Sequence, residues 1–136
     1  MEGETIYQAA STELPTVLIV ENDVFSMELN KRVLRSICNI EVATDGKTAV
    51  EKATSKPYNL IIMDIELGLG INGMEATKQI RQINGYEKVP IIAVTAYATK
   101  AHKEEFLSGG CTHYLSKPIN VSEMFILIKD LLNQSE

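Results

Sequence analysis

Polar side chains able to hold a metal ion or a phosphoryl group follow several apolar runs of this 136-residue chain. The six that stand at the ends of such runs are Glu21, Asn22, Asp23, Asp64, Thr95 and Lys117. Clustered carboxylates repel one another unless a cation joins them, and oxygen ligands that leave positions open favour Mg²⁺. A hydroxyl and an ammonium beside such an ion would bind a phosphoryl group. The pattern therefore indicates phosphoryl transfer by positioning and charge neutralisation.

Asp64 is the predicted reactive residue. The stretch Asn59–Glu66 places four consecutive apolar residues directly before it, with Pro57 upstream and glycines downstream. A continuous apolar run of this kind is typical of a strand buried on both faces, and ligands bind outside the carboxyl ends of parallel strands. Because carboxylates form acyl-phosphate intermediates, Asp64 can act as the nucleophile.

The elements that must position these residues alternate regularly. Strands are predicted at 16–20, 39–43, 59–64, 90–95 and 112–116, each followed by an amphipathic or polar stretch that suits a helix. Asp23 is expected to cap the first helix, whose apolar positions are Phe25, Leu29, Val33 and Ile37. Parallel neighbours need a crossover helix, so five such alternations predict a doubly wound α/β domain.

Composition sets the class of protein. With 45% hydrophobic and 23% charged residues the chain suits one globular domain, and a net charge of −5 argues against direct nucleic-acid binding. No apolar run approaches the ~20 residues of a membrane span. We expect residues 1–15 to be a flexible leader without a secretory signal, 16–133 the domain and 134–136 a tail. Cys38 and Cys111 are expected to be reduced core residues.

Four motifs carry a family resemblance. VLIVEND, IIMD, IIAVTAYA and YLSKPI, in this order, resemble the receiver domain of two-component response regulators and hybrid histidine kinases, over residues 16–133. The resemblance implies a flavodoxin-like (βα)5 fold whose parallel five-stranded sheet has the order 2-1-3-4-5. It also implies a cis peptide bond between Lys117 and Pro118.

The resemblance also implies roles for individual residues. Asp64 matches the phosphoacceptor, Thr95 the switch hydroxyl, Lys117 the phosphate-contacting lysine and Tyr114 the switch aromatic. The implied Mg²⁺ ligands are Glu21, Asn22, Asp64 and the main-chain carbonyl of Glu66. The side chain of Glu66 itself is expected to be a charge at the rim of the site.

The implied partner is a histidine kinase or a histidine phosphotransfer protein, which donates the phosphoryl group in the cytoplasm. The chemistry is limited to self-phosphorylation and slow dephosphorylation, without turnover of a small substrate. Phosphorylation would remodel a protein-binding face, and a phosphorylation-dependent dimer is one form that this output could take. The downstream partner is left open.

Two features depart from the family pattern. Asn22 stands where a second metal-binding aspartate is usual, which removes one negative charge, and Asp23 next to it is an auxiliary candidate. The loop Glu66–Asn72 carries Gly68 and Gly70 where a Met-Pro pair is frequent, so a longer and more mobile loop is expected. The alternative function is therefore a pseudo-receiver, an interaction module with little or no phosphorylation. A phosphatase of the haloacid-dehalogenase type is disfavoured, because this sequence lacks that family's aspartate pair and has no room for its cap domain.

Overall fold

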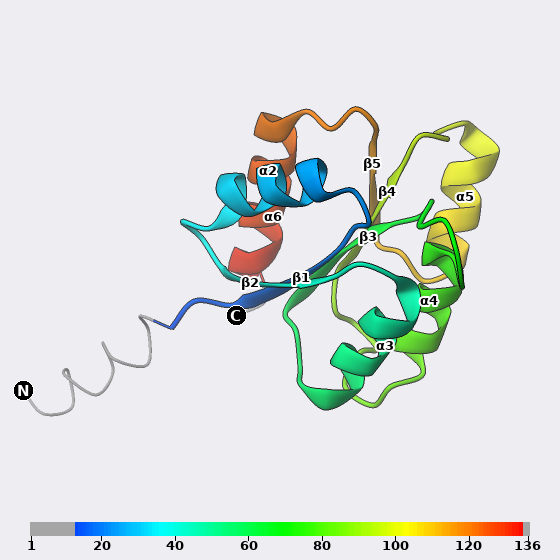
Figure 1. The fold of residues 1–136 in the computed structure, drawn as a ribbon, viewed down its shortest axis with the longest axis horizontal. Coiled ribbons are helices and arrows are strands. Elements are labelled where there is room, and N and C mark those ends of the chain that lie inside the picture. Colours follow the sequence, from blue (N-terminus) through cyan, green and yellow to red (C-terminus); the bar gives the residue numbers. More distant parts are fainter. Residues whose placement is uncertain (1–12, 135–136) are drawn as a thin grey trace, which may run out of the picture.

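The computed structural model describes residues 13–134, so residues 1–12 of the predicted leader 1–15 and the last two tail residues lie outside the described residues. Its strands are β1 (Thr16–Val20), β2 (Asn39–Ala43), β3 (Leu60–Asp64), β4 (Ile91–Thr95) and β5 (His113–Ser116). All pair in parallel, in the order β2-β1-β3-β4-β5 (Figure 1). The predicted fold class and strand order are therefore confirmed.

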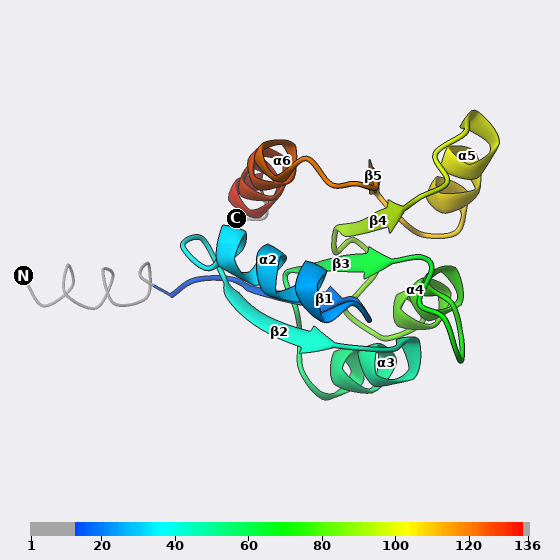
Figure 2. The ribbon, with the colours of Figure 1, turned by 45° about the horizontal axis from the view of Figure 1, so that its top comes forward.

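Helices cover both faces of the sheet. On one face lie α2 (Val24–Leu34) and α6 (Val121–Gln134), and on the other α3 (Gly46–Ser55), α4 (Gly73–Arg81) and α5 (Lys100–Ser108). In Figure 2 the sheet runs diagonally, with α2 and α6 on its upper left side and α3 and α4 on its lower right side. Because all five strands run parallel, their carboxyl ends share one edge of the sheet.

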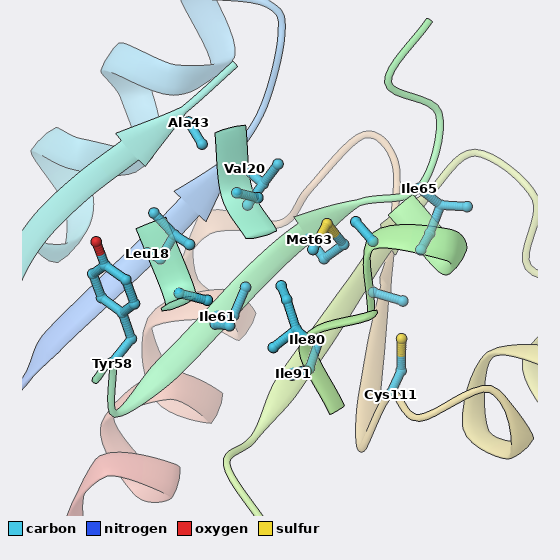
Figure 3. Close-up of a cluster of buried hydrophobic side chains, with 14 of the residues drawn as sticks. Leu18, Val20, Ala43, Tyr58, Ile61, Met63, Ile65, Ile80, Ile91 and Cys111 are labelled. Carbon is cyan, nitrogen blue, oxygen red and sulfur yellow. The ribbon is translucent and has the colours of Figure 1, made fainter. Parts of the chain in front are cut away.

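Two hydrophobic cores hold this edge in place. The core under α3, α4 and α5 includes Leu18, Val20, Ile61, Met63, Ile80 and Ile91, which gather in Figure 3. The strand residues between them point the opposite way, because successive side chains of a strand face opposite sides, and pack under α2 and α6. Burying each large aliphatic side chain stabilises the fold by about 1.5–3 kcal/mol. All five residues of β3 are buried, so the strand that ends in Asp64 is anchored on both faces.

Side-chain caps begin the helices at the same edge of the sheet. The N-caps of α2, α3, α4 and α5 are Asp23, Asp45, Asn72 and Thr99, and each accepts a bond from a main-chain N–H in the first turn. The predicted capping role of Asp23 is confirmed, since its carboxylate accepts from the N–H of Ser26 at 2.8 Å. This bond lowers the pKa of Asp23 below its usual value.

The predicted apolar face of α2 was partly wrong. Phe25 is 78% exposed and Leu29 is also exposed, whereas Met27, Asn30 and Leu34 are the buried residues of the helix. Apolar residues stand on more than one side of α2, so periodicity alone did not select the stripe that packs on the sheet. Gln134, which was predicted to begin the tail, is instead the last residue of α6.

The state of the two cysteines and the hydrophobicity of the helices bear on the predictions made from composition. Cys38 and Cys111 are both free and buried, as expected, and burial raises the pKa of each thiol to about 11. Within residues 13–134 no helix has the length and apolar character that crossing a bilayer requires.

Candidate functional site

Asp64 lies at the carboxyl edge of the sheet, where the sequence predicted it. It is 1% exposed, and the ammonium Nζ of Lys117 lies 2.9 Å from its Oδ1. Lys117 follows β5, and its main-chain N–H donates to the carbonyl of Thr95 at the end of β4. The Lys117–Pro118 peptide bond is cis, as the resemblance implied. Residues 53 positions apart in the chain thus form an ion pair at one strand end.

The two oxygens of Asp64 have different surroundings. Oδ1 accepts from Lys117 Nζ and from the main-chain N–H of Glu66, each at 2.9 Å. Oδ2 is buried, and it is the single buried side-chain oxygen or nitrogen in residues 13–134 without a hydrogen-bond partner. Leaving a buried carboxylate oxygen unpaired costs free energy, so Oδ2 is a natural ligand position for a cation or an acceptor for a phosphoryl group.

Glu21 supplies the second buried carboxylate. Burial, together with the negative charge of Asp64, raises its pKa to about 7. The main-chain N–H of Asp23 at 3.1 Å and the charge of Lys117 act in the opposite direction but do not outweigh these effects. A divalent cation bound beside Glu21 would favour the ionised form of this carboxylate.

Lys117 balances part of this negative charge. Its partial burial lowers its pKa, but the hydrogen bond and charge of Asp64, followed by the charges of Glu66 and Glu21, outweigh that effect. The pKa of Lys117 therefore lies above its usual value, and the side chain stays positively charged. A permanent cation beside Oδ1 is suited to neutralising an incoming phosphoryl group.

The residues present fit Mg²⁺ with a reduced set of charges. Within residues 13–134 no three histidine, cysteine, aspartate or glutamate side chains form a metal-binding group. Direct protein ligands would therefore be the carboxylates of Glu21 and Asp64, with amide or main-chain oxygens and water completing the shell. The amide nitrogen of Asn22 donates to the carbonyl of Leu67 at 3.1 Å, and the carboxylate of Asp23 caps α2. The predicted metal-ligand roles all stay predictions: those of Glu21, Asn22, Asp23, Asp64 and the Glu66 carbonyl.

The two predicted switch residues lie on adjacent strands, Thr95 at the end of β4 and Tyr114 within β5. Thr95 is fully buried, its hydroxyl donates to Glu66 Oε2 at 2.6 Å, and it accepts from the N–H of Tyr97 at 3.0 Å. Tyr114 on β5 is partly buried, and Lys103 Nζ lies 4.7 Å from the centre of its ring. Both side chains are held by specific contacts, which a switch between two arrangements must exchange.

A cleft of about 360 Å³ leads from the surface to Asp64. Its lining residues are Glu21, Asn22, Asp23, Phe25, Ser26, Leu29, Asn30, Asp64, Lys117, Pro118 and Ile119. Sequence reasoning missed the apolar wall of this cleft, which comes from Phe25 and Leu29 on α2 and from Ile119. The available signal was the position of Phe25 two residues after Asp23, at the start of a helix that begins beside the site.

Replacing Glu21 by glutamine is expected to stabilise the metal-free protein by about 1–3 kcal/mol at about pH 8. The pKa of Glu21 is raised from 4.5 to about 7, so its stabilising contribution is present below pH 4.5 and is lost as the pH rises through 7. Glutamine removes the charge and can still accept from the N–H of Asp23. Urea unfolding at about pH 4 and about pH 8 measures the difference, which should vanish at the lower pH.

The control for this substitution is Glu51→Gln, which removes an exposed charge on α3 and should leave stability unchanged. Added Mg²⁺ should stabilise the wild type more than Glu21→Gln, because the variant has lost a carboxylate ligand. A Glu21→Gln protein less stable than the wild type at about pH 8 without metal would contradict the electrostatic account of Glu21.

Comparisons with known proteins agree on one family. A family model described as the response regulator receiver domain matches residues 17–129. The chain is 39% identical to hybrid signal transduction histidine kinase I of Dictyostelium discoideum over 82% of its own length, and it spans 7% of that relative.

Two solved structures share the fold. One is the receiver domain of the Pseudomonas aeruginosa sensor histidine kinase PA1611 with a magnesium ion coordinated in its active-site cleft. It is 30% identical, with a TM-score of 0.79 and coverage of 88% of this chain and 98% of that one. The other is the receiver domain of Ssk1 in complex with the histidine phosphotransfer protein Ypd1 of Saccharomyces cerevisiae. It is 30% identical, with a TM-score of 0.82 and coverage of 90% and 92%.

Proposed function

Because the chain belongs to the response regulator receiver domain family, we propose that it accepts a phosphoryl group from a histidine onto Asp64, with Mg²⁺ as cofactor. The observation that carries this proposal is the state of Asp64, which is buried with one oxygen on Lys117 and the other without a partner. The proposed setting is a cytoplasmic two-component or phosphorelay system, in which the family pairs with histidine kinases and phosphotransfer proteins.

The proposed reaction moves one phosphoryl group. A carboxylate oxygen of Asp64 bonds to phosphorus while the bond from phosphorus to the histidine nitrogen breaks. The electron pair of that bond stays on the imidazole, which then takes a proton from water. Lys117 and the hydroxyl of Thr95 would neutralise and hydrogen-bond the transferred oxygens. A bound Mg²⁺, held by Glu21, Asp64 and further oxygen ligands, would supply additional charge neutralisation at the phosphoryl group.

The approach to Asp64 suits a protein phosphodonor. Val24, Phe25 and Leu29 are exposed apolar residues of α2, and Phe25 and Leu29 line the cleft that contains Asp64. Exposed apolar side chains grouped beside a polar site mark a docking surface, and aromatic residues contribute most to such interfaces. The solved complex of the Ssk1 receiver domain with Ypd1 supports a histidine phosphotransfer protein as one donor.

Replacing Phe25 by alanine is expected to slow transfer from a histidine phosphotransfer protein about tenfold or more, because truncating a central aromatic contact costs ~2 kcal/mol of binding. Uptake from a small acyl-phosphate donor should change much less, since a small molecule needs no docking surface. Rapid-quench measurement of both reactions separates the two effects. The matched control is Leu107→Ala, an exposed leucine of α5 outside this cleft.

Equal transfer from the protein donor to wild type and Phe25→Ala would show that α2 is not the docking surface. Failure of the wild type to accept phosphoryl groups from either donor would contradict the proposed function itself. The two readouts therefore test the partner surface and the phosphoacceptor role separately.

A second candidate function is an interaction module that is not phosphorylated. The observation that favours it is Asn22, whose amide nitrogen binds the Leu67 carbonyl and thereby ties the loop after β3 to the end of β1. An ionised aspartate could not donate this bond. Asn22 therefore makes a contact with the loop that the negatively charged aspartate implied by the family resemblance could not make. A titration with Mg²⁺, followed by a small phosphodonor, separates the two candidates.

A further inference from the structure

The Glu66 side chain was expected to be a charge at the rim of the site, but its carboxylate makes three specific contacts. Its Oε2 accepts from the hydroxyl of Thr95 at 2.6 Å, and its Oε1 accepts from the main-chain N–H of Ala96 at 3.0 Å. The ammonium of Lys117 lies 3.4 Å from the same Oε1. Both carboxylate oxygens are therefore bound, by a hydroxyl, an amide and a cation that converge from β4 and from the residue after β5.

These three groups together form an anion-binding cradle. Charge-assisted hydrogen bonds of this kind are stronger than neutral ones, and a buried hydroxyl such as that of Thr95 is fixed before the anion arrives. Thr95 and Lys117 are also the side chains that the proposed function assigns to a phosphoryl group on Asp64. Thr95 has a single O–H donor, so its hydroxyl cannot donate to the Glu66 carboxylate and to a phosphoryl group at the same time.

Glu66 can leave this cradle without unfolding the domain. It stands two residues after Asp64, in the segment between β3 and α4, and its side chain is 31% exposed. Gly68 and Gly70 follow it with φ values of +87° and +84°, which glycine adopts without strain. Rotation of one partly exposed side chain would free Thr95, Ala96 and Lys117 for another anion.

We propose that the Glu66 carboxylate is an internal anion that occupies the phosphoryl-binding groups of the unphosphorylated domain and is displaced when Asp64 is phosphorylated. This inference rests on the proposed function, because the displaced group matters only if a phosphoryl group enters. It makes Glu66 a positioning residue that sets how readily the site accepts a phosphoryl group. Apparent affinity falls in proportion to the fraction of molecules whose cradle is free.

Beryllofluoride, an acyl-phosphate analogue, tests the competition in the presence of constant Mg²⁺. If the cradle is free in about one molecule in ten, Glu66→Ala should bind beryllofluoride about tenfold more tightly than the wild type. Glu66→Gln should lie between the two, because its neutral amide is a weaker occupant. Glu51→Gln, which removes the same charge from exposed α3, should bind as the wild type does.

The amide proton resonance of Ala96 reports occupancy without any ligand. A bond to a carboxylate moves this resonance downfield, so Glu66→Ala should return it upfield and Glu51→Gln should not. Tighter binding by Glu66→Ala with an unchanged Ala96 resonance would indicate a charge effect alone and would overturn the inference. Equal or weaker binding by Glu66→Ala would overturn it as well.

If the proposed function is wrong, the beryllofluoride experiment gives a different result. If neither wild type nor Glu66→Ala binds beryllofluoride, the phosphoacceptor role is wrong and the inferred competition falls with it, whatever the Ala96 resonance shows. If the wild type binds beryllofluoride and Glu66→Ala gains nothing, only the role of Glu66 is wrong.

Discussion

Asp64→Asn protein is expected to take up no phosphoryl group from a small acyl-phosphate donor under conditions in which the wild type takes up one. An amide is not a nucleophile towards phosphorus, whereas a carboxylate forms an acyl phosphate. Asparagine has nearly the same volume and its oxygen can still accept from Lys117 and from the N–H of Glu66. Intact-protein mass spectrometry after exposure to the donor and Mg²⁺ measures the result.

The matched control for Asp64→Asn is Asp45→Asn. Asp45 caps α3 by accepting from the N–H of Thr48 at 2.7 Å, and asparagine is an equally good N-cap, so this variant should take up the phosphoryl group normally. Uptake by Asp64→Asn at the wild-type rate would show that the phosphoacceptor lies elsewhere.

Replacing Gly73 by alanine is expected to destabilise the protein by about 2–4 kcal/mol, because the added methyl group collides with main-chain atoms. A Cβ at this position would overlap the carbonyl oxygen of Asp64 and lie 2.7 Å from the Cα of Ile65. Neither atom belongs to a flexible side chain, and Ile65 N–H is bonded to Val94 in the neighbouring strand. Relief of the overlap must therefore move the backbone that carries Asp64.

Gly46→Ala is the matched control for Gly73→Ala. Each glycine is the first residue of a helix after an Asp or Asn cap, but a Cβ on Gly46 would meet mainly the flexible side chain of Ile71. We expect this control to cost about 1 kcal/mol or less. Urea unfolding measures both variants, and equal stability of Gly73→Ala and wild type would contradict the close approach of α4 to β3.

Much of this site was predictable from sequence because of the geometry of a parallel sheet. Apolar runs that end in polar residues define the strands, and parallel strands place their carboxyl ends at one edge. Asp64, Thr95 and Lys117 were thus expected at one edge, and the strand order that the family resemblance implied placed them at the ends of neighbouring strands. The structure brings Lys117 to 2.9 Å from Asp64, whereas the hydroxyl of Thr95 binds Glu66.

The contacts of the Glu66 side chain and the buried face of α2 were not predictable in the same way. The path of the segment after β3, where Gly68 and Gly70 have positive φ, decides where the Glu66 carboxylate points, and no periodicity encodes that path. On α2, the buried amide of Asn30 and the exposed ring of Phe25 reverse the usual preference. Such reversals depend on the neighbouring elements, and the exposed Phe25 lies beside the candidate site, where departures from local rules are expected.

The proposed Mg²⁺ site has an amide at Asn22, where the family resemblance implies a second metal-binding aspartate. With Glu21 and Asp64 as the remaining carboxylates, the direct protein charge offered to Mg²⁺ is smaller than three carboxylates would give. Burial, and to a smaller extent the negative charge of Asp64, raises the pKa of Glu21 to about 7, and a bound cation would favour its ionised form. Phosphorylation is therefore expected to need Mg²⁺ at millimolar rather than micromolar concentrations.

The most direct test of the account is to locate the phosphoryl group by peptide mass spectrometry after treating the wild type with a small acyl-phosphate donor. The account predicts one phosphoryl group on Asp64 at millimolar Mg²⁺ and none when the metal is chelated. An unmodified Asp64 at millimolar Mg²⁺, in folded protein, would contradict the phosphoacceptor function and would favour the unphosphorylated interaction module.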